Sequence, residues 1–135
     1  MNTIRRTSVL LLLAVALAAC SGTREPGALI GPQEAYELVQ SGEATLVDVR
    51  SEAAYEQAHL AGAVLVPLMQ VGSNADRLAA RERTIITYCS CPNEETSIAA
   101  ADQLIAAGLD DVLVLRGGIR GWAAEGLPLR PGTRP

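Results

Sequence analysis

Four short apolar runs, separated by segments of helical character, constrain the fold of this chain more than any other feature. Apolar residues occupy neighbouring positions in each run rather than every second position, which is typical of strands buried on both faces of a parallel sheet. The runs cover residues 45–49, 63–66, 84–88 and 112–115. Helices are expected around them, at about 31–41, 52–58, 74–83, 97–107 and 119–125. This order predicts an α/β domain with a central, mostly parallel sheet and helices on both faces.

The bulk composition excludes several classes of protein. A chain of 135 residues is long enough for one domain. Its net charge of −4, without a basic stripe, argues against a nucleic-acid partner. The three cysteines, Cys20, Cys89 and Cys91, are too few for a disulfide scaffold. We also expect no cofactor.

The first twenty residues resemble an export signal. Arg5 and Arg6 precede an apolar run over 9–19, which has the length of a secretory signal and is short for a membrane span. The run ends in Leu-Ala-Ala-Cys at 17–20, which resembles the bacterial lipoprotein box. An ordinary cleavable leader with an incidental cysteine is the alternative.

The lipoprotein resemblance implies a domain organisation and a location. Two or three acyl chains on one cysteine would hold a protein firmly to a membrane. We therefore expect an envelope protein that faces the periplasm, and Ser21 resembles an outer-membrane sorting signal for a cell with two membranes. The expected parts are a removed signal peptide (1–19), a lipidated Cys20 with a flexible tether (20–28), a domain (29–131) and a tail (132–135).

A cysteine-bearing segment joins the most strongly β-forming run, 84–88, to a helix expected from Ser97. Cys89 opens this segment, where backbone N–H groups of the helix N-terminus converge. We expect these donors to lower the pKa of the thiol, so that a nucleophilic thiolate is present at neutral pH. The residues that follow form the candidate substrate-binding loop: Ser90, Cys91, Pro92, Asn93, Glu94, Glu95, Thr96 and Ser97.

From about Leu29 to Pro131 the chain resembles the rhodanese-like domain family. The resemblance rests on the order and spacing of several short motifs. They are Asp48-Val49-Arg50, His59-Leu60-Ala61-Gly62-Ala63, Cys89 after a strand, Ala99-Ala100-Ala101 with Leu104 and Gly108, and Gly117-Gly118-Ile119-Arg120-Gly121-Trp122. It implies a sulfurtransferase that carries sulfane sulfur as a persulfide on the loop cysteine and passes it to a thiol or cyanide.

The resemblance leaves two cysteines open as the nucleophile. Counted forward from the strand, the family position falls on Cys89, which we take as the catalytic residue. Counted back from Gly117-Gly118, it falls on Cys91, which is then either the nucleophile itself or a residue that resolves a persulfide on Cys89. The pair could also hold Cu(I) or zinc, but a third thiol or a nearby histidine is lacking, so we expect no metal.

Other residues of the motifs suggest supporting roles. Asp48 and Arg50 are expected to fix the fold beside the loop. His59 is expected to stabilise a turn, and Trp122 is expected to pack in the core.

The acidic pair Glu94 and Glu95 bears on the sulfur donor. One interpretation is that their charge disfavours the thiosulfate dianion, so that a neutral, protein-bound or low-molecular-weight thiol persulfide is the expected donor. The other is that both side chains point to water at the first helical turn, where they favour the helix dipole.

Two further functions remain open besides sulfur transfer. Cys89 and Cys91 could cycle between dithiol and disulfide in a redox or sensing module. Alternatively, the domain could be non-catalytic and bind an unidentified envelope protein.

Overall fold

The computed structural model describes residues 24–132, and a parallel five-stranded sheet forms its centre. The strand order is β1-β6-β5-β2-β4, and every neighbouring pair in it is parallel. A separate antiparallel pair is formed by β3 and β7. The predicted α/β fold with a mostly parallel sheet is therefore confirmed. The strands are β1 (Leu29–Ile30), β2 (Ala44–Asp48), β3 (His59–Leu60), β4 (Val64–Leu65), β5 (Thr84–Tyr88), β6 (Val112–Leu115) and β7 (Leu129–Arg130).

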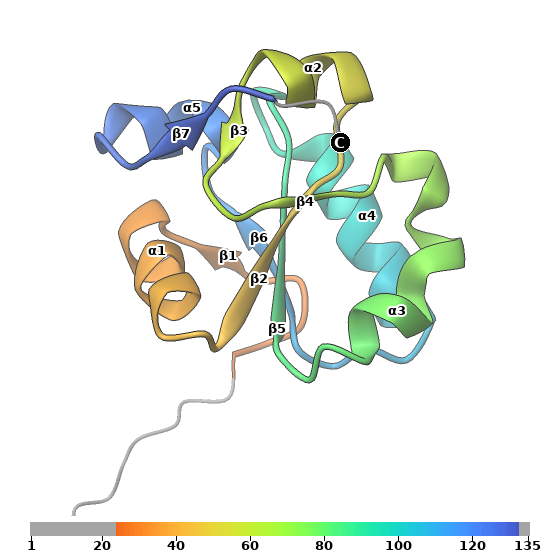
Figure 1. Cartoon of the computed structure of the whole chain (residues 1–135). Helices are drawn as coiled ribbons and strands as arrows, with labels where there is room; N and C mark the ends of the chain where they lie inside the picture. The colour runs from red at the N-terminus through yellow and green to blue at the C-terminus, as the bar shows by residue number, and fades with distance from the viewer. Residues whose placement is uncertain (1–23, 133–135) are drawn as a thin grey trace, which may run out of the picture.

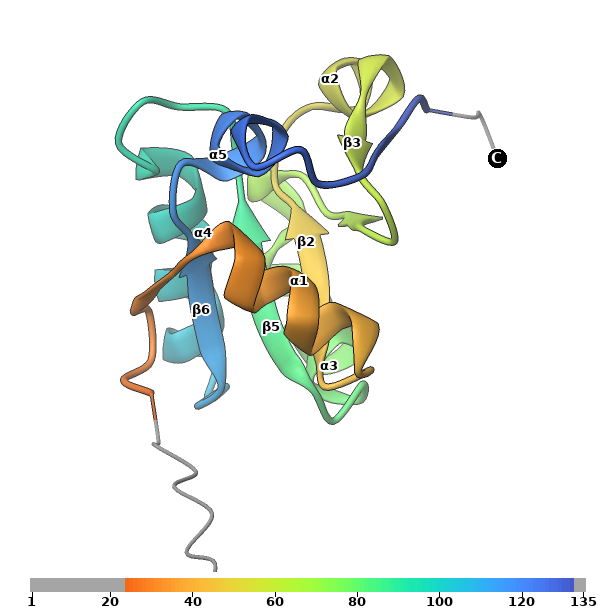
Figure 2. The same cartoon turned by 90° about the vertical axis from the view of Figure 1, so that its left-hand side faces the viewer.

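Helices cover both faces of the sheet. Figure 1 shows α1 (Pro32–Gln40) and α5 (Gly118–Ala124) on one side, and α3 (Ala75–Ala79) and α4 (Glu95–Ala106) on the other. Figure 2, turned by a quarter, shows α1 in front of β5 and β2. The helix α2 (Glu52–Gln57) follows β2, and two short 3-10 turns, Leu68–Gln70 and Gly72–Asn74, lead from β4 to α3.

Alternate residues of each central strand enter different halves of the core, because side chains along a strand point to opposite faces. In β5, Ile85 packs with the α3/α4 half and Ile86 with the α1/α5 half. In β2, Leu46 packs with the α1/α5 half and Val47 with the α3/α4 half. Both faces are buried, which explains why the sequence of these strands is apolar without alternation.

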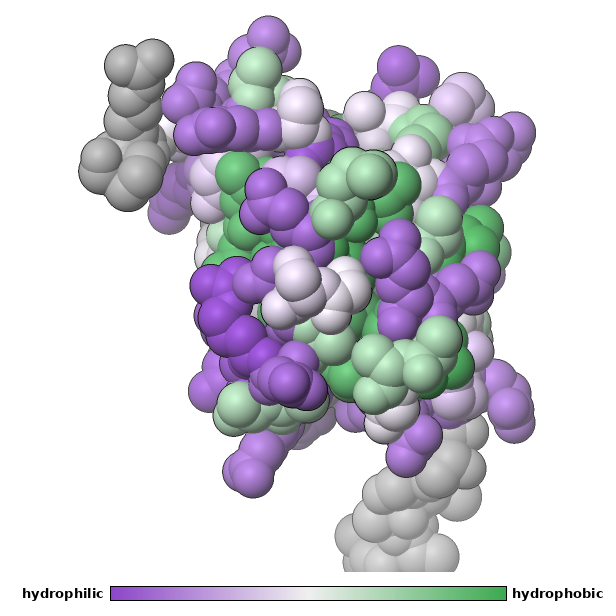
Figure 3. All heavy atoms as spheres, turned by 90° about the vertical axis from the view of Figure 1, so that its right-hand side faces the viewer, coloured by the Kyte–Doolittle hydropathy of each residue, from purple (hydrophilic) through white to green (hydrophobic). Residues whose placement is uncertain are grey.

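The surface over α3 and α4 mixes polar and apolar side chains. Figure 3 shows this face, on which hydrophilic patches interrupt the hydrophobic ones. Two large apolar side chains of these elements and the preceding turn are exposed: Met69 at 92% and Ile98 at 40%. The face is therefore not one continuous apolar surface.

Several expected elements differ in the structure. The expected turn at His59 is the strand β3, and the expected strand 63–66 is reduced to Val64–Leu65. The expected helix 74–83 is the five-residue α3, and α4 begins at Glu95, two residues before the expected start at Ser97. Short strands at either end of the domain, β1 and β7, were not anticipated.

The expected signal peptide 1–19, the lipidated Cys20 and the first part of the tether lie outside the described residues, as does most of the tail. Between residues 24 and 132, none of the helices combines the length and hydropathy that crossing a bilayer requires.

Candidate active site

The cysteine-bearing loop lies at the carboxyl edge of the parallel sheet, where ligand sites of open α/β folds occur. It leaves β5 after Tyr88 and enters α4 at Glu95. The neighbouring strand β2 ends beside it, because Asp48 pairs in register with Tyr88. Because β2 and β5 run parallel, their carboxyl ends lie at the same edge of the sheet.

Cys89 is the deeper of the two loop thiols. The residue is 1% exposed and belongs to the core half that α3 and α4 cover. Its Sγ accepts a hydrogen bond from the backbone N–H of Cys91 at 3.4 Å and lies 3.5 Å from Ser97 Oγ. The Ser97 hydroxyl donates its proton to the carbonyl of Glu94 at 3.0 Å. The backbone N–H of Ser97 also donates to the Cys89 sulfur, so this thiol has two amide donors and a hydroxyl beside it.

Cys91 is half-buried and lies closer to the helix N-terminus. Its Sγ–H donates to Thr96 Oγ1 at 3.1 Å, and its Sγ accepts a hydrogen bond from the Thr96 backbone N–H. Thr96 is the second residue of α4, whose first-turn N–H groups have no partner within the helix. Both sulfurs thus meet donors of the first turn of α4, Cys91 at Thr96 and Cys89 at Ser97.

The two thiols have opposite pKa shifts. Burial, followed by the hydrogen bond with Cys91, raises the pKa of Cys89. For Cys91, burial acts upwards, but hydrogen bonds from Cys89 and Thr96 outweigh it and lower the pKa. The expected depression of the Cys89 pKa is therefore wrong. The sequence indicated the helix N-terminus correctly, but it did not reveal that Cys89 is enclosed by the core.

Glu94 is not directed to water. It adopts the left-handed conformation with φ 57° immediately before α4, and its Oε1 accepts a hydrogen bond from the Gly117 N–H at 2.5 Å. Glu95 is exposed and accepts a bond from the Asn93 side chain at 3.4 Å. The water-facing interpretation thus fits Glu95 and is wrong for Glu94. Glu94 ties the loop to the turn before α5.

A glycine turn packs against the backbone of the nucleophile loop. Gly118 has φ 51°, and a Cβ at this position would stand 2.2 Å from the carbonyl oxygen of Cys89. The next residue, Ile119, donates its N–H to that same oxygen at 3.0 Å. A side chain at Gly118 would push the loop away, so this glycine determines how closely α5 approaches Cys89.

The residues expected to support the loop form a buried network under it. The Asp48 carboxylate accepts bonds from Arg50, including one from Nη2 at 2.6 Å, and another from the Tyr88 hydroxyl at 2.7 Å. Arg50 also donates to the carbonyl of Ala58, and Leu60 donates its N–H to the Tyr88 hydroxyl. The Asp48 side chain is fully buried and that of Arg50 is 10% exposed. This network connects the ends of β2 and β5 to β3.

Tyr88 was not singled out from the sequence, although it precedes Cys89. Burial, and then the negative charge of Asp48, raise the pKa of its hydroxyl, which stays protonated and donates to Asp48. A tyrosine that ends a buried strand needs a partner for its hydroxyl, and this requirement is the signal that could have identified it.

His59 and Trp122 occupy structural positions. The His59 ring stacks on Tyr55 with 3.7 Å between ring centroids, and its Nδ1 is 3.0 Å from the Tyr55 carbonyl. Trp122 is fully buried and donates its Nε1–H to the carbonyl of Pro128. Trp122 thus packs in the core as expected, whereas His59 lies in the strand β3 and supports the end of α2 instead of a turn.

The remaining loop residues form the outer rim of the site. Ser90, Pro92 and Asn93 are exposed, whereas Ser97 is fully buried. Within residues 24–132, no three His, Cys, Asp or Glu side chains gather as a metal site would require.

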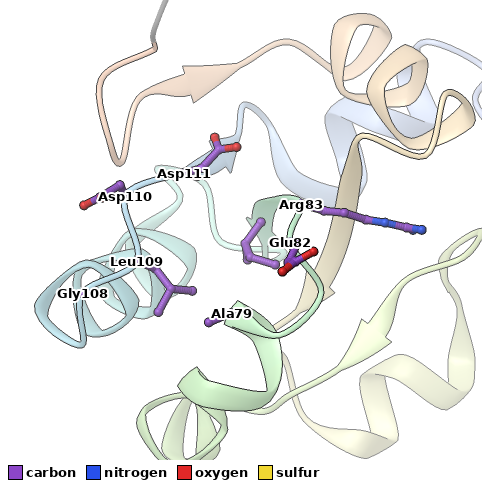
Figure 4. A pocket seen from close by; sticks show the side chains of 8 residues that line it. Ala79, Glu82, Arg83, Gly108, Leu109, Asp110 and Asp111 are labelled. Atoms are coloured by element: carbon purple, nitrogen blue, oxygen red, sulfur yellow. The ribbon is translucent and has the colours of Figure 1, made fainter.

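A surface hollow that the sequence did not reveal lies at the opposite edge of the sheet. It has a volume of about 310 Å³ and is lined by residues near the start of β5 and β6 and the end of α4. Figure 4 shows Glu82, Asp110 and Asp111 around it, with Arg83 extending away. The hollow holds no thiol and is separated from Cys89 by the length of β5.

The family is decided by a match over most of the folded part of the chain. Residues 31–125 match the model of the rhodanese-like domain. This chain belongs to the rhodanese-like domain family. The match runs from the turn before α1 to the end of α5 and includes the whole cysteine loop.

The relatives of this rhodanese-like domain include sulfurtransferases. It is 30% identical over 92 residues to the thiosulfate sulfurtransferase GlpE of Coxiella burnetii, covering 68% of this chain and 83% of that protein. It is 33% identical over 108 residues to the probable adenylyltransferase/sulfurtransferase MoeZ of Mycobacterium tuberculosis, covering 76% of this chain but 26% of that protein. The chain thus spans about a quarter of that longer relative.

A solved structure shares the fold along most of its length. The solution structure of a rhodanese-like domain from an Anabaena protein superposes with a TM-score of 0.69 at 26% identity, covering 81% of each chain.

Proposed function

We propose that this domain is a sulfurtransferase that carries sulfane sulfur as a persulfide on the loop beginning at Cys89. The observation that carries the proposal is the position of both thiols against the first turn of α4, where Thr96 and Ser97 contact them. Donors at a helix N-terminus stabilise a thiolate and the anionic sulfur of a persulfide. The function requires that one thiol of the pair, Cys89 or Cys91, carries the sulfur.

The transfer proceeds in two displacement steps that balance without an oxidant. In the first, the loop thiolate attacks the outer sulfur of a donor persulfide R–S–SH, and the donor S–S bond breaks to release R–S⁻. In the second, an acceptor thiolate or cyanide attacks the outer sulfur of the protein persulfide and regenerates the loop thiolate. Only the thiolate form of the cysteine is nucleophilic in these steps.

The charge of the loop favours a thiol persulfide over thiosulfate as the donor. Glu94 and Glu95 bring two carboxylates to the loop, and the loop residues 89–97 contain no Arg, Lys or His. Like charge at short range opposes the approach of a dianion. The GlpE relative is named a thiosulfate sulfurtransferase, so the donor is a property in which this chain is expected to differ.

Mass spectrometry of the intact protein tests the proposal. The full chain is incubated with glutathione persulfide, and we expect a mass gain of one sulfur atom that a thiol acceptor or cyanide then removes. The double variant Cys89→Ser/Cys91→Ser is the control and should gain no sulfur in the loop, which peptide mapping distinguishes from sulfur on Cys20. A wild-type protein that gains no sulfur on either loop cysteine would contradict the proposed function.

A redox module is the second candidate, and the proximity of the two loop cysteines favours it, since the Cys91 N–H donates to the Cys89 sulfur at 3.4 Å. In this case Cys89 and Cys91 would form a disulfide by losing two electrons to an external oxidant. Thiol titration of protein taken from its native envelope separates the candidates, because a stable disulfide supports the redox module, whereas free thiols or a persulfide support sulfur transfer.

We also propose that the protein is anchored in the cell envelope through lipid on Cys20. The proposal rests on the Leu-Ala-Ala-Cys sequence at 17–20 after an apolar run. Fractionation of cells that express the full chain should recover it with membranes, and Cys20→Ala should abolish this recovery. An unchanged membrane fraction for Cys20→Ala would contradict lipid anchoring.

A further inference from the structure

Both ends of the cysteine loop are hydrogen-bonded to the turn that begins α5. At the first end, the carbonyl of Cys89 accepts the Ile119 N–H at 3.0 Å. At the other end, the carboxylate of Glu94 accepts the Gly117 N–H at 2.5 Å. Figure 2 shows the stretch between β5 and α4 beside α5. The loop is therefore closed against α5 by two bonds, one from the backbone and one from a side chain.

The sulfur of Cys89 lies on the inner side of this closed loop. Cys89 is 1% exposed, and its Sγ accepts the N–H of Cys91 at 3.4 Å and the N–H of Ser97. Attack on a donor requires the sulfur of the nucleophile to contact the donor directly. The loop must therefore move before a donor can reach Cys89.

The Glu94 carboxylate has a special place among the side chains of the loop. Over residues 90–95 of the described chain, it makes the only side-chain hydrogen bond to a residue outside the loop and α4. Neither of the ion pairs found between residues 24 and 132 includes Glu94. The bond to Gly117 is thus the contact whose loss would free this end of the loop.

Two glutamates of the described chain adopt the left-handed conformation, with φ 51° at Glu82 and 57° at Glu94. This conformation favours glycine, because a Cβ is sterically opposed there. Glu82 is exposed, and its carboxylate has no hydrogen bond or ion pair within residues 24–132. Only Glu94 combines the strained backbone with a bonded side chain. Glu82 is therefore a reference for the effect of the backbone alone.

We propose that Glu94 is a positioning residue that holds the loop closed over the Cys89 sulfur, and that breaking its bond to Gly117 gives a sulfur donor access. This inference rests on the proposed sulfur-transfer function and adds a control of access to the same site. The bond breaks and forms again without covalent chemistry, so closed and open loops are in equilibrium. The bond from Ile119 to the Cys89 carbonyl remains, so the cysteine keeps its place while the Glu94 end of the loop moves.

Alkylation of Cys89 by iodoacetamide in the full chain measures how readily the loop opens. Trypsin cuts after Arg83 and Arg116, so one peptide carries both loop cysteines, and fragmentation resolves them. Glu94→Gly removes the carboxylate and also relieves the positive φ, so this variant is expected to stay folded. Cys89 should be labelled about 10-fold faster than in the wild type, because the closed state loses one hydrogen bond to a charged group.

Two further variants separate the hydrogen bond from the charge and from the backbone. Glu94→Gln removes the charge but keeps an oxygen that accepts the Gly117 N–H, so labelling of Cys89 should stay within about 2-fold of the wild-type rate. Glu82→Gly makes the same backbone change outside the loop and should leave the labelling rate unchanged. Loading with glutathione persulfide should be faster in Glu94→Gly than in Glu94→Gln. Thermal unfolding verifies that each variant is folded.

The contrary outcomes are distinct. Equal labelling in Glu94→Gly and the wild type overturns the inference, because the loop then opens without breaking the bond. An equal rise in Glu94→Gln assigns the effect to charge and overturns it as well. A rise in Glu82→Gly, or one matched by a fall in unfolding temperature, indicates general loosening and has the same consequence.

The sulfur assay distinguishes failure of this inference from failure of the proposed function. Faster labelling of Glu94→Gly without faster sulfur loading would show that the bond does not control access of the donor, while the function stands. A wild-type chain that gains no sulfur refutes the function, and the labelling rates still decide whether Glu94 holds the loop closed.

Discussion

The carboxyl ends of β2 and β5 lie side by side, but their polar groups differ: those at β2 are held in short hydrogen bonds, whereas those at β5 surround two cysteine sulfurs at longer distances. At the end of β2, the buried Asp48 carboxylate is matched by the Arg50 guanidinium and the Tyr88 hydroxyl with bonds of 2.6 to 3.2 Å. At the end of β5, the sulfurs of Cys89 and Cys91 have hydroxyl and amide neighbours at 3.1 to 3.5 Å.

The difference shows how a fixed support and a reactive group are placed next to each other. At the β2 end, the Asp48 carboxylate is buried and hydrogen-bonded to Arg50 and Tyr88. These bonds fix the chain and leave the carboxylate unavailable to a ligand. At the β5 end, the hydroxyl and amide groups beside the two cysteine sulfurs can also hydrogen-bond to the outer sulfur of a persulfide. Tyr88 belongs to both ends, because its hydroxyl bonds Asp48 and its carbonyl accepts from Val49 just before the cysteine loop.

Removal of the Asp48 side chain should have the largest effect on stability. It leaves the positive charge of Arg50 without its partner, and the Arg50 side chain is only 10% exposed. Asp48→Ala is expected to lower the free energy of unfolding by about 3–5 kcal/mol. Asp102→Ala, at an exposed position on α4, is the control and should change it by less than about 0.5 kcal/mol. Denaturant unfolding measures both. A loss at Asp48 no larger than that at Asp102 would contradict the supporting role of the β2 end.

Substitution of Gly118 should act on the β5 end. Gly118→Ala places a Cβ 2.2 Å from the Cys89 carbonyl, in addition to its positive φ. Gly62→Ala is the matched control, since it has φ 82° but no heavy atom within 4 Å of the new Cβ. The clash should cost about 1–3 kcal/mol beyond the control and should also slow sulfur loading. Equal stability and loading in the two variants would show that α5 does not hold the loop.

Removal of the Tyr88 hydroxyl tests the connection between the two ends. Tyr88→Phe deletes the bonds to Asp48 and to the Leu60 N–H, and should cost about 1–2 kcal/mol of unfolding free energy. The cysteine loop keeps its own contacts, so the rate of sulfur loading should remain near the wild-type value. A large loss of loading with unchanged stability would mean that Tyr88 acts on the thiols directly.

Neutralisation of Glu94 should have the smallest effect, and this effect should be on the rate of reaction with a charged sulfur donor. Glu94→Gln keeps an oxygen that can accept from Gly117 N–H but removes the charge. At low salt we expect the rate with thiosulfate to rise by about 3- to 10-fold, with little change for a neutral persulfide. Glu95→Gln, at the exposed position, should give a smaller rise. If thiosulfate rates stay unchanged in both variants, charge does not determine the donor.

Most of the sheet and the longer helices could be predicted from the sequence, because the central strands are continuous apolar runs and the helices show helical spacing of apolar residues. The run 84–88 forms β5 and the run 112–115 forms β6 with the expected bounds. The strands β1, β3 and β7 have two residues each, which is too short for any periodicity, and they exist only because a distant partner lies beside them.

The site was predicted in position but not in detail. The loop after β5 and its contact with the N-terminus of α4 follow from a cysteine between a strand and a helix. Which thiol the core encloses, and that Glu94 reaches Gly117 across 23 positions of sequence, depend on tertiary packing. The sign of the Cys89 pKa shift was wrong for the same reason, since burial outweighs the nearby amides.

The most direct test of the account is the pH dependence of alkylation of the wild-type protein by iodoacetamide, resolved for Cys89 and Cys91 by peptide mapping. A thiol reacts as its thiolate, so its rate rises with pH through its pKa, and a lowered pKa moves that rise to lower pH. We predict that Cys91 reacts first, with its half-maximal rate below the pH of an ordinary cysteine, and that Cys89 reacts above it. If both thiols titrate at or above the ordinary value, the N-terminus of α4 does not create a nucleophilic thiolate, and the sulfurtransferase mechanism loses its physical basis.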